Sequence, residues 1–240
     1  MRLAHTYRKG RVFLAGDSAH IHSTTGGQGL NCCMQDAYNL GWKLAFVVKK
    51  LANPSLLETY EAERRPIAEQ VIWAASSLHE IFMGHGKDIA ERAQKIRDPE
   101  FLEAVVGRCS GISYTYRDQA QQHGSSAPAP AIGDRAPDVD LGRGRTLFDL
   151  TRHASCTLLA LPAREAGQAA LQASLKALVR RFASVVELRI VPPTPSLAER
   201  YGSSDEDRLL LLRPDGYVGY RCNASEVAAL EMRLHEWFAL

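Results

Sequence analysis

The fold is decided by residues 11–31, which read RVFLAGDSAHIHSTTGGQGLN. A short apolar strand at residues 12–15 runs into Gly16-Asp17, and a polar loop then leads to a glycine-rich turn. A long amphipathic helix follows the turn. This order places a carboxylate at a strand end close to a helix N-terminus. The arrangement suits a ligand with hydroxyl groups at one point and a polarised or anionic group at another.

The residue types in this stretch supply that chemistry. Asp17 is ionised at neutral pH and only accepts hydrogen bonds, so it can bind a polyol. Gly16 has no Cβ, which lets the backbone pass close to a ligand. Gly26, Gly27 and Gly29 allow positive φ and expose backbone N–H groups. The first helical turn leaves about four such donors unpaired, and the helix dipole adds roughly half a positive charge there, so a negatively polarised ligand atom is favoured.

About twenty residues of this stretch match, in order, a known flavin-binding motif. The stretch closely resembles the second flavin-binding motif of the group A FAD-dependent aromatic hydroxylases, which share the para-hydroxybenzoate hydroxylase fold. The resemblance implies that Asp17 binds the ribityl chain of FAD and that the backbone of residues 27–31 faces the pyrimidine side of the flavin ring. The candidate cofactor-binding residues are Gly16, Asp17, Thr24, Gly27, Gln28, Gly29, Leu30 and Asn31.

One position departs from the family pattern. The family usually has a proline just before the glycine turn, whereas this chain has Ser23-Thr24. A proline would fix φ and remove an N–H donor, and Thr24 does neither. The family pattern therefore supports Thr24 as a site residue less strongly than it supports Asp17.

His20 and His22 form a His-x-His pair that could chelate a metal ion. Asp17 is the only carboxylate nearby in sequence, and the flavin hypothesis already uses it, so the ligand set is incomplete. We therefore predict that these histidines are structural and that the chain binds no metal. They could also act as general bases, but no residue of the chain is assigned as a catalytic acid or base.

Composition narrows the classes of function. The chain has 240 residues, enough for one large or two small domains, and a net charge of +2, which is too small to indicate nucleic-acid binding. No apolar stretch is long enough to span a bilayer, and no signal peptide follows Met1. The chain has five cysteines, an odd number, and no Cys-x-x-Cys motif. This pattern indicates a protein of a reducing compartment rather than one held together by disulfides. We expect a cytoplasmic protein.

The helix after the glycine turn is predicted to run from about residue 28 to residue 50. Within it, Cys32 and Cys33 are interpreted as small packing residues, although a helix N-terminus could lower the pKa of the Cys32 thiol. Apolar side chains recur at three-four spacing and form one continuous face. This face consists of Leu30, Cys33, Met34, Ala37, Leu40, Gly41, Leu44, Ala45 and Val48.

Further helices follow. We expect one that ends at residues 61–66, a third at residues 67–82 that starts near Pro66, and shorter ones at residues 87–96 and 99–106. The segment YEAERRP at residues 60–66 is another feature that the aromatic hydroxylases share. We interpret it as a helix–helix corner that ion pairs hold in place.

Residues 121–133 are small, polar and proline-containing, which indicates a linker between a domain of residues 1–120 and a domain of residues 134–240. The turn signal Arg213-Pro214-Asp215-Gly216 predicts a hairpin in the second domain. The strands are expected at residues 156–161, 185–191, 208–212 and 217–221, and the helices at residues 166–182, 196–201 and 225–238. The resulting order β-α-β-α-β-β-α is thioredoxin-like.

The second domain resembles the C-terminal thioredoxin-like domain attached to many phenol, polyketide and antibiotic hydroxylases of this family. The matching segments are GDRAPD at 133–138, TLFDL at 146–150 and LRPDGYV at 212–218. A redox-active domain of this fold needs two thiols at the start of its first helix, and LPAR at 161–164 contains none. We therefore predict a packing or interface role and no oxidoreductase activity for this domain.

The predicted fold class is α/β: a partial FAD-binding domain, made of a strand plus helices, followed by a thioredoxin-like α/β domain. The Gly-x-Gly-x-x-Gly turn that binds the FAD diphosphate in the family does not occur in the sequence. We therefore expect the C-terminal portion of such an enzyme, whose partner is the missing N-terminal FAD and substrate portion. A parallel strand at residues 12–15 without neighbours would leave an open edge, so the chain alone is expected to be unstable or to self-associate.

The resemblance implies a monooxygenase that binds FAD, takes NAD(P)H as co-substrate and uses O2 to hydroxylate an aromatic small molecule, phenolic or polyketide. The alternative is a non-catalytic, truncated or split-gene interaction module built on the thioredoxin-like domain, which the missing diphosphate motif favours. A third hypothesis is a family member that oxidises a non-aromatic substrate, because the substrate-facing sheet of the family is absent from the sequence.

Overall fold

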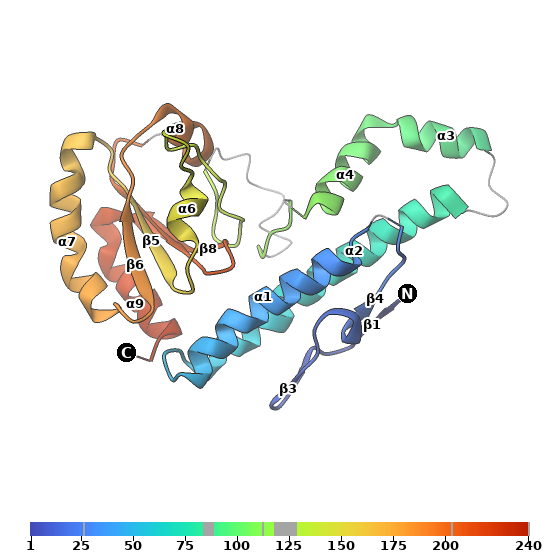
Figure 1. Cartoon of the computed structure of the whole chain (residues 1–240), viewed down its shortest axis with the longest axis horizontal. Helices are drawn as coiled ribbons and strands as arrows, with labels where there is room; N and C mark the ends of the chain where they lie inside the picture. The colour runs from blue at the N-terminus through green and yellow to red at the C-terminus, as the bar shows by residue number, and fades with distance from the viewer. Residues whose placement is uncertain (26, 84–88, 112, 118–128, 203, 240) are drawn as a thin grey trace. The chain divides into compact units, whose positions relative to one another are not determined.

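The computed structural model describes residues 1–25, 27–83, 89–111, 113–117, 129–202 and 204–239 (Figure 1). The chain divides into two compact units: the first contains residues 1–44 and 55–114, and the second contains residues 45–54 and 115–240. Residues 121–128 of the predicted linker lie outside the described residues. No helix in the described ranges is both long enough and apolar enough to cross a membrane.

The first unit begins with two small antiparallel pairs of strands. β1 (Arg2–Leu3) pairs with β4 (His20–Ile21), and β2 (Arg8–Lys9) pairs with β3 (Val12–Phe13). Gly10 adopts a φ of +60°, which lets the chain reverse between β2 and β3. The prediction of a parallel strand at residues 12–15 is therefore wrong, because β3 ends at Phe13 and pairs with its own antiparallel neighbour.

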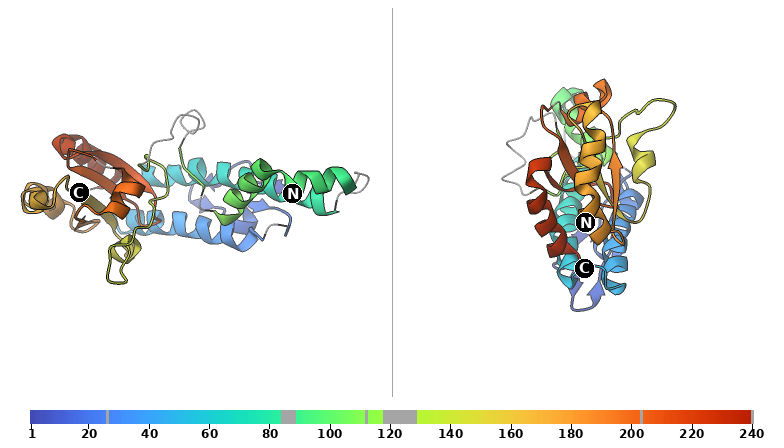
Figure 2. Two further views of the ribbon diagram at one scale, coloured as in Figure 1. Left: turned by 90° about the horizontal axis from the view of Figure 1, so that it is seen from above. Right: turned by 90° about the vertical axis from the view of Figure 1, so that its left-hand side faces the viewer.

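Helices form most of the remaining N-terminal region. They are η1 (Gly16–Ser18), α1 (Gly29–Val48), η2 (Pro54–Glu58), α2 (Thr59–Met83), α3 (Ile89–Arg97) and α4 (Pro99–Ser110). The views in Figures 1 and 2 show α1 and α2 side by side, running in opposite directions. Lys43 Nζ of α1 and Glu63 Oε2 of α2 form an ion pair of 2.7 Å that joins them.

Helix α2 is continuous through Pro66. The sequence predicted separate helices before and after this proline, and that prediction is wrong. Pro66 is exposed, whereas Tyr60, Arg64 and Ile67 are buried. The contacts of these buried residues hold the helix together across a residue that has no N–H to donate to the carbonyl of Ala62.

Helix α1 buries polar residues and exposes apolar ones. Asp36 and Lys43 are fully buried, whereas Leu30, Met34 and Val48 are 73%, 63% and 76% exposed. The predicted apolar face is present, but it is largely the exposed side of the helix. The buried side carries Asp36 and Lys43 beside apolar residues such as Leu40 and Phe46, and the ion-pair partners of the two charged residues lie on α2.

The second unit contains one four-stranded mixed sheet. Its elements are α6 (Leu147–Thr151), β5 (Cys156–Leu161), η3 (Glu165–Gly167), α7 (Gln168–Arg181), β6 (Val186–Ile190), α8 (Pro195–Tyr201), β7 (Arg208–Leu212), β8 (Val218–Asn223), η4 (Ala224–Glu226) and α9 (Val227–Trp237). The strand order is β6-β5-β7-β8; β5 and β6 are parallel, and β7 is antiparallel to both of its neighbours. The predicted order of strands and helices is confirmed.

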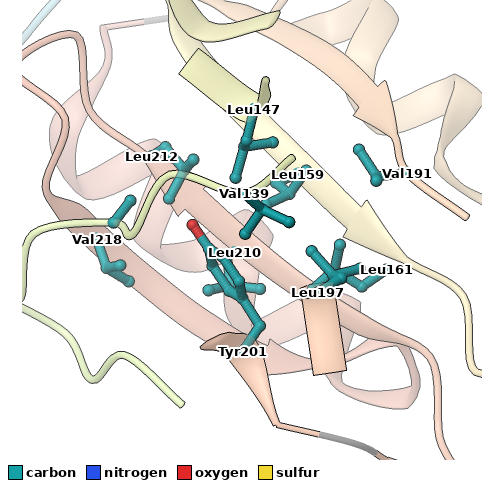
Figure 3. Close-up of a cluster of buried hydrophobic side chains, with 11 residues drawn as sticks. Val139, Leu147, Leu159, Leu161, Val191, Leu197, Tyr201, Leu210, Leu212 and Val218 are labelled. Carbon is teal, nitrogen blue, oxygen red and sulfur yellow. The ribbon is translucent and has the colours of Figure 1, made fainter. Parts of the chain in front are cut away.

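Alternation along the strands divides the leucines of this sheet between its two faces. On one face, Leu159 and Leu161 of β5 and Leu210 and Leu212 of β7 form a buried cluster with Tyr201 of α8 (Figure 3). Leu147 of α6 and Leu197 of α8 belong to the same cluster (Figure 3). The sheet is therefore covered on this side by the short helices.

The last residue of the predicted linker, Gly133, is hydrogen-bonded to the sheet. Gly133 donates its backbone N–H to the carbonyl of Val218 at 2.8 Å, and Val218 donates back to the carbonyl of Asp134 at 2.8 Å. An ideal Cβ on Gly133 would lie 2.9 Å from the backbone nitrogen of Arg117, so this close passage requires glycine. The chain at residues 133–134 thus extends the edge of the sheet beside β8.

The substitution Pro66→Ala is expected to stabilise the protein. Alanine would restore the N–H that α2 lacks at this exposed position and remove the clash of the ring with the preceding turn, a gain of about 2 kcal/mol after the added flexibility of the unfolded chain is subtracted. Urea unfolding followed by circular dichroism measures the change.

Pro99→Ala is the matched control, because Pro99 is the first residue of α4, where proline is tolerated. An unchanged or lower free energy of unfolding in Pro66→Ala would contradict the prediction.

Candidate functional site

The turn at Gly16 and Asp17 is built around a positive φ of +60° at Gly16. Gly16 is buried, and its N–H donates to Asp36 Oδ2 at 3.1 Å. An ideal Cβ at this position would lie 2.9 Å from Cys33 Sγ. Any side chain would therefore push the turn away from α1, so glycine is required here.

The Asp17 side chain is exposed and lies against the first turns of α1. Cys33 Sγ donates to Asp17 Oδ1 at 3.4 Å. Burial of the thiol and its hydrogen bond to Asp17 raise the pKa of Cys33 to about 11, so the thiol stays protonated at neutral pH. The contact leaves most of the acceptor capacity of the carboxylate open to a ligand.

The glycine turn leads directly into the start of α1. Gly27 donates its N–H to the carbonyl of Thr24 at 3.0 Å and adopts a φ of +66°. Apart from Gly27 itself and its two neighbours in the chain, no described atom lies within 4 Å of an ideal Cβ on Gly27. Of the other predicted residues, Gln28 is buried, whereas Leu30 and Asn31 are exposed. The first N–H groups of α1 therefore open beside Asp17 and the turn.

Hydroxyl groups hold the loop in which the family usually has a proline. Ser23 Oγ and Thr25 Oγ1 lie 2.9 Å apart, and Thr25 donates its N–H to Ser23 Oγ at 3.2 Å. His79 Nδ1 of α2 lies 3.3 Å from Ser23 Oγ and 3.4 Å from Thr25 Oγ1. Thr24 itself is exposed. These contacts fix the loop by side-chain hydrogen bonds where a proline would restrict φ.

A cluster of four buried side chains lies behind this turn. This buried ion cluster consists of His20, Cys32, Asp36 and Arg64. Asp36 Oδ2 accepts from His20 Nε2 at 2.8 Å, and Asp36 Oδ1 accepts from Arg64 Nε at 2.7 Å. Cys32 Sγ lies 3.6 Å from His20 Nε2 and 3.7 Å from Arg64 Nη2.

The charges of this cluster support one another. Burial opposes the charged form of His20, but hydrogen bonds to Asp36 and Cys32 outweigh it and raise the pKa of His20 to about 9. Burial likewise opposes ionisation of Asp36, but His20, Arg64 and the N–H of Gly16 hold the pKa of Asp36 below its usual range. Asp36 is therefore an ionised carboxylate between two cations at neutral pH.

His20, Cys32 and Asp36 bring three possible metal-ligand atoms within 4.8 Å of one another. His22 and Asp17, the candidate ligands nearest to His20 in the sequence, do not belong to this group. Asp36, sixteen residues further on, is the carboxylate that contacts His20. Because the guanidinium of Arg64 already contacts both Asp36 and Cys32, the positive charge that a metal would supply is present in the protein itself.

The sequence pattern missed the importance of Asp36, although one signal was available. Asp36 is a charged residue inside a helix whose periodicity is otherwise apolar. The predicted ion pairing of the YEAERRP segment is confirmed for Arg64, which binds Asp36. Glu61 of the same segment accepts the backbone N–H groups of Tyr7 and Arg8 at 2.8 and 3.2 Å. The predicted helix–helix corner is wrong, because the whole segment lies within α2.

The second unit has no thiol where a redox-active domain of its fold would need one. The chain after β5 carries Pro162 and Ala163, and Ala163 donates its N–H to Asp207 Oδ1 at 2.7 Å. Cys156 is fully buried within β5, and burial raises the pKa of its thiol. The described residues of this region thus offer no reactive thiol pair.

Comparisons with known proteins give consistent matches to both units. A family model described as an FAD binding domain matches residues 1–75, and one described as the C-terminal region of aromatic-ring hydroxylases matches residues 129–239. Pentachlorophenol 4-monooxygenase of Sphingobium chlorophenolicum is 42% identical over 236 residues, covering 92% of this chain and 44% of the relative. A flavin-dependent monooxygenase of Mycobacteroides abscessus is 38% identical over 218 residues, covering 91% of this chain and 38% of the relative.

A solved structure shows the same similarity. The anhydrotetracycline hydroxylase OxyS of Streptomyces rimosus superposes with a TM-score of 0.76 at 32% identity, covering 99% of this chain and 46% of that chain. The chain therefore spans less than half the length of these relatives.

Replacing Asp36 with asparagine is expected to lower the free energy of unfolding by about 3–5 kcal/mol, because two buried cations would lose their shared anion. Urea unfolding monitored by circular dichroism measures this change. Asp17→Asn is the matched control: its side chain is exposed, so a change within about 0.5 kcal/mol is expected. Equal effects of the two substitutions would contradict the assignment of Asp36 as the centre of the cluster.

The protonation of His20 should make the free energy of unfolding depend on pH. Its pKa is raised from 6.5 to about 9 in the folded protein, so its stabilising charge is fully present below pH 6.5 and is lost as the pH rises to 9. Asp36 acts in the opposite direction, because its lowered pKa gives stability that is lost only in acid, below its usual value of 3.8. Between pH 6.5 and pH 9 the free energy of unfolding is expected to fall by an amount on the order of 3 kcal/mol.

Urea unfolding midpoints between pH 6.5 and 9 test this dependence. His20→Asn should flatten the curve, and the control His22→Asn should leave its slope unchanged. A slope that persists in His20→Asn would assign the titration to another group.

Proposed function

Because the chain belongs to the FAD-dependent aromatic-ring hydroxylase family, we propose that it forms the ribityl-binding and ring-binding side of the flavin site in a monooxygenase that hydroxylates an aromatic substrate. The observation that carries this proposal is the 3.4 Å contact between Cys33 Sγ and Asp17 Oδ1. It holds an exposed carboxylate beside the exposed start of α1. The names of the relatives, which include a pentachlorophenol and an anhydrotetracycline enzyme, support a phenolic or polyketide substrate.

The described residues fit a flavin. Asp17 offers unused acceptor sites for the hydroxyl groups of the ribityl chain. Gly16 and Gly27 both have positive φ, and the space next to Gly27 is open for the approach of a ring. The N–H groups of Gly29, Leu30 and Asn31 come before the first intrahelical donor of α1, so they can donate to polar atoms on the pyrimidine side of the ring. Gln28, the residue just before α1, is buried.

Bound FAD would supply the redox chemistry, in which NAD(P)H gives the electrons and one oxygen atom of O2 is transferred to the aromatic ring. The residues of this chain bind and orient the cofactor. Asp17 fixes the ribityl chain, and the positive end of the α1 dipole favours negative charge that develops on the nearby ring atoms. No described residue of the chain is proposed as an acid or base in the oxygen transfer.

The whole protein is proposed to work in the cytoplasm, for which the odd number of cysteines is the support. The exposed apolar side chains of Leu30, Met34 and Val48 on α1 support contact with further protein surface. That surface is either the remaining portion of the flavin site or a second copy of the chain.

A titration of the purified chain with FAD, followed by flavin fluorescence, tests the site. Saturable binding is expected, and Asp17→Ala should weaken it at least about tenfold, since charge-assisted hydrogen bonds to the ribityl hydroxyls would be lost. The control Glu58→Ala removes an exposed carboxylate elsewhere in η2 and should leave binding unchanged. Equal binding by wild type and Asp17→Ala would overturn the role of Asp17.

Absence of saturable binding would overturn the preformed site in this chain and leave the interaction module built on the second unit as the better hypothesis. The substrate class is tested separately, with the natural polypeptide that contains this sequence. The proposal expects NAD(P)H consumption coupled to a hydroxylated phenol, and consumption without an aromatic product would overturn it.

A further inference from the structure

A pocket of about 230 Å³ opens on one face of the sheet in the second unit. Arg208 of β7 and Arg221 of β8 line it. In the register of these strands Arg208 is opposite Asn223, and Arg221 is opposite Leu210. Because alternate residues of a strand share a face, the two arginine side chains lie on the same face as diagonal neighbours. We call this feature the arginine pocket.

Both arginines bind main-chain carbonyls and still have donors left. Arg208 donates through Nη1 to the carbonyl of Tyr201 and through Nη2 to that of Gly202, each at 2.6 Å. Arg221 donates through Nη1 to the carbonyl of Pro130 at 2.9 Å. The Nε of Arg208 is buried and has no hydrogen-bond partner among the described residues. A buried donor without an acceptor is costly, so this N–H favours an added acceptor.

The positive charges of the pocket are not neutralised by the carbonyls that they bind. Among the described residues, no carboxylate lies within ion-pair distance of Arg208 or Arg221. Burial and the charge of Arg221 lower the pKa of Arg208, as expected for two neighbouring cations. Glu226 also lines the pocket, but its side chain is engaged at the start of η4, where Oε2 accepts the N–H of Asn223 at 3.0 Å.

The volume of the pocket limits the size of its ligand. A value of 230 Å³ is below the range of roughly 300–1,000 Å³ that is usual for sites of drug-sized molecules. It is several times the roughly 30 Å³ that one water occupies in the liquid. The space therefore suits one small group together with its waters.

We propose that the arginine pocket binds a small oxyanion, a phosphate or a carboxylate group, through Nε of Arg208 and the remaining N–H groups of Arg221. A guanidinium offers several donors in one plane, which matches the oxygen atoms of such groups. An anion here satisfies the buried Nε donor and offsets the repulsion between the two cations. The site belongs to the second unit alone and is independent of the flavin proposal.

Thermal unfolding of the full chain with increasing inorganic phosphate tests the proposal, with chloride added to keep the ionic strength constant. A ligand that binds the folded state raises the unfolding midpoint, and the rise gives the affinity. A parallel series with acetate distinguishes a preference for phosphate from one for carboxylate. Phosphate also stabilises proteins without a site, so the difference between variants is the quantity that counts.

Arg221→Gln should weaken phosphate binding at least about tenfold, since a charge-assisted contact would be lost. Arg200→Gln is the matched control, because Arg200 is an exposed residue of α8 outside the pocket. Equal responses of wild type and Arg221→Gln would overturn the proposal and leave the arginines as supports of the main chain.

A second variant keeps the test valid if Arg221→Gln does not fold. Glu226→Gln retains both arginines and an acceptor at the start of η4, and it removes the negative charge from the pocket. It is expected to bind phosphate about two- to threefold more tightly, in line with the small energies of partly screened charges. Unchanged or weaker binding by Glu226→Gln would count against the proposal.

Discussion

The N-terminal unit depends on one buried carboxylate, that of Asp36. It accepts hydrogen bonds from the N–H of Gly16 at 3.1 Å, from Nε2 of His20 at 2.8 Å and from Nε of Arg64 at 2.7 Å. These donors come from three different segments: the turn after β3, strand β4 and helix α2. A buried charge is stable only when such partners surround it. The position of each segment is therefore fixed by the same acceptor group.

This constraint explains why Asp17, the next residue after Gly16, is free to bind a ligand. The hydrogen bond to Asp36 holds Gly16 inward with a positive φ, where Cys33 leaves no room for a side chain. The side chain that follows is then directed to the surface, where its only described partner is the thiol of Cys33. Two carboxylates near the same turn thus have different roles, because both oxygens of buried Asp36 accept hydrogen bonds from the protein, whereas exposed Asp17 keeps most of its acceptor capacity.

Local patterns predicted the second unit well and the first unit less well, for a physical reason. Strands such as β5 and β7 combine buried leucines on both faces with strong turn signals, so their limits follow from the sequence. In α1 the periodicity identified an apolar face, but periodicity does not say which face another element covers. The covered face there also contains Asp36 and Lys43, which have charged partners on α2. Those partners are brought close only by the tertiary fold.

The two units use buried charge in opposite ways. In the first, a carboxylate binds cationic side chains, so the hydrogen bonds that order the backbone also join opposite charges. In the second, Arg208 and Arg221 bind main-chain carbonyls, which satisfy donors but carry no net charge. The first arrangement pairs both of its cations with one carboxylate, although His20 Nδ1 is buried without a hydrogen-bond partner among the described residues. In the second, two neighbouring positive charges have no carboxylate partner among the described residues and one buried donor has no acceptor, and this imbalance favours an anion in the arginine pocket.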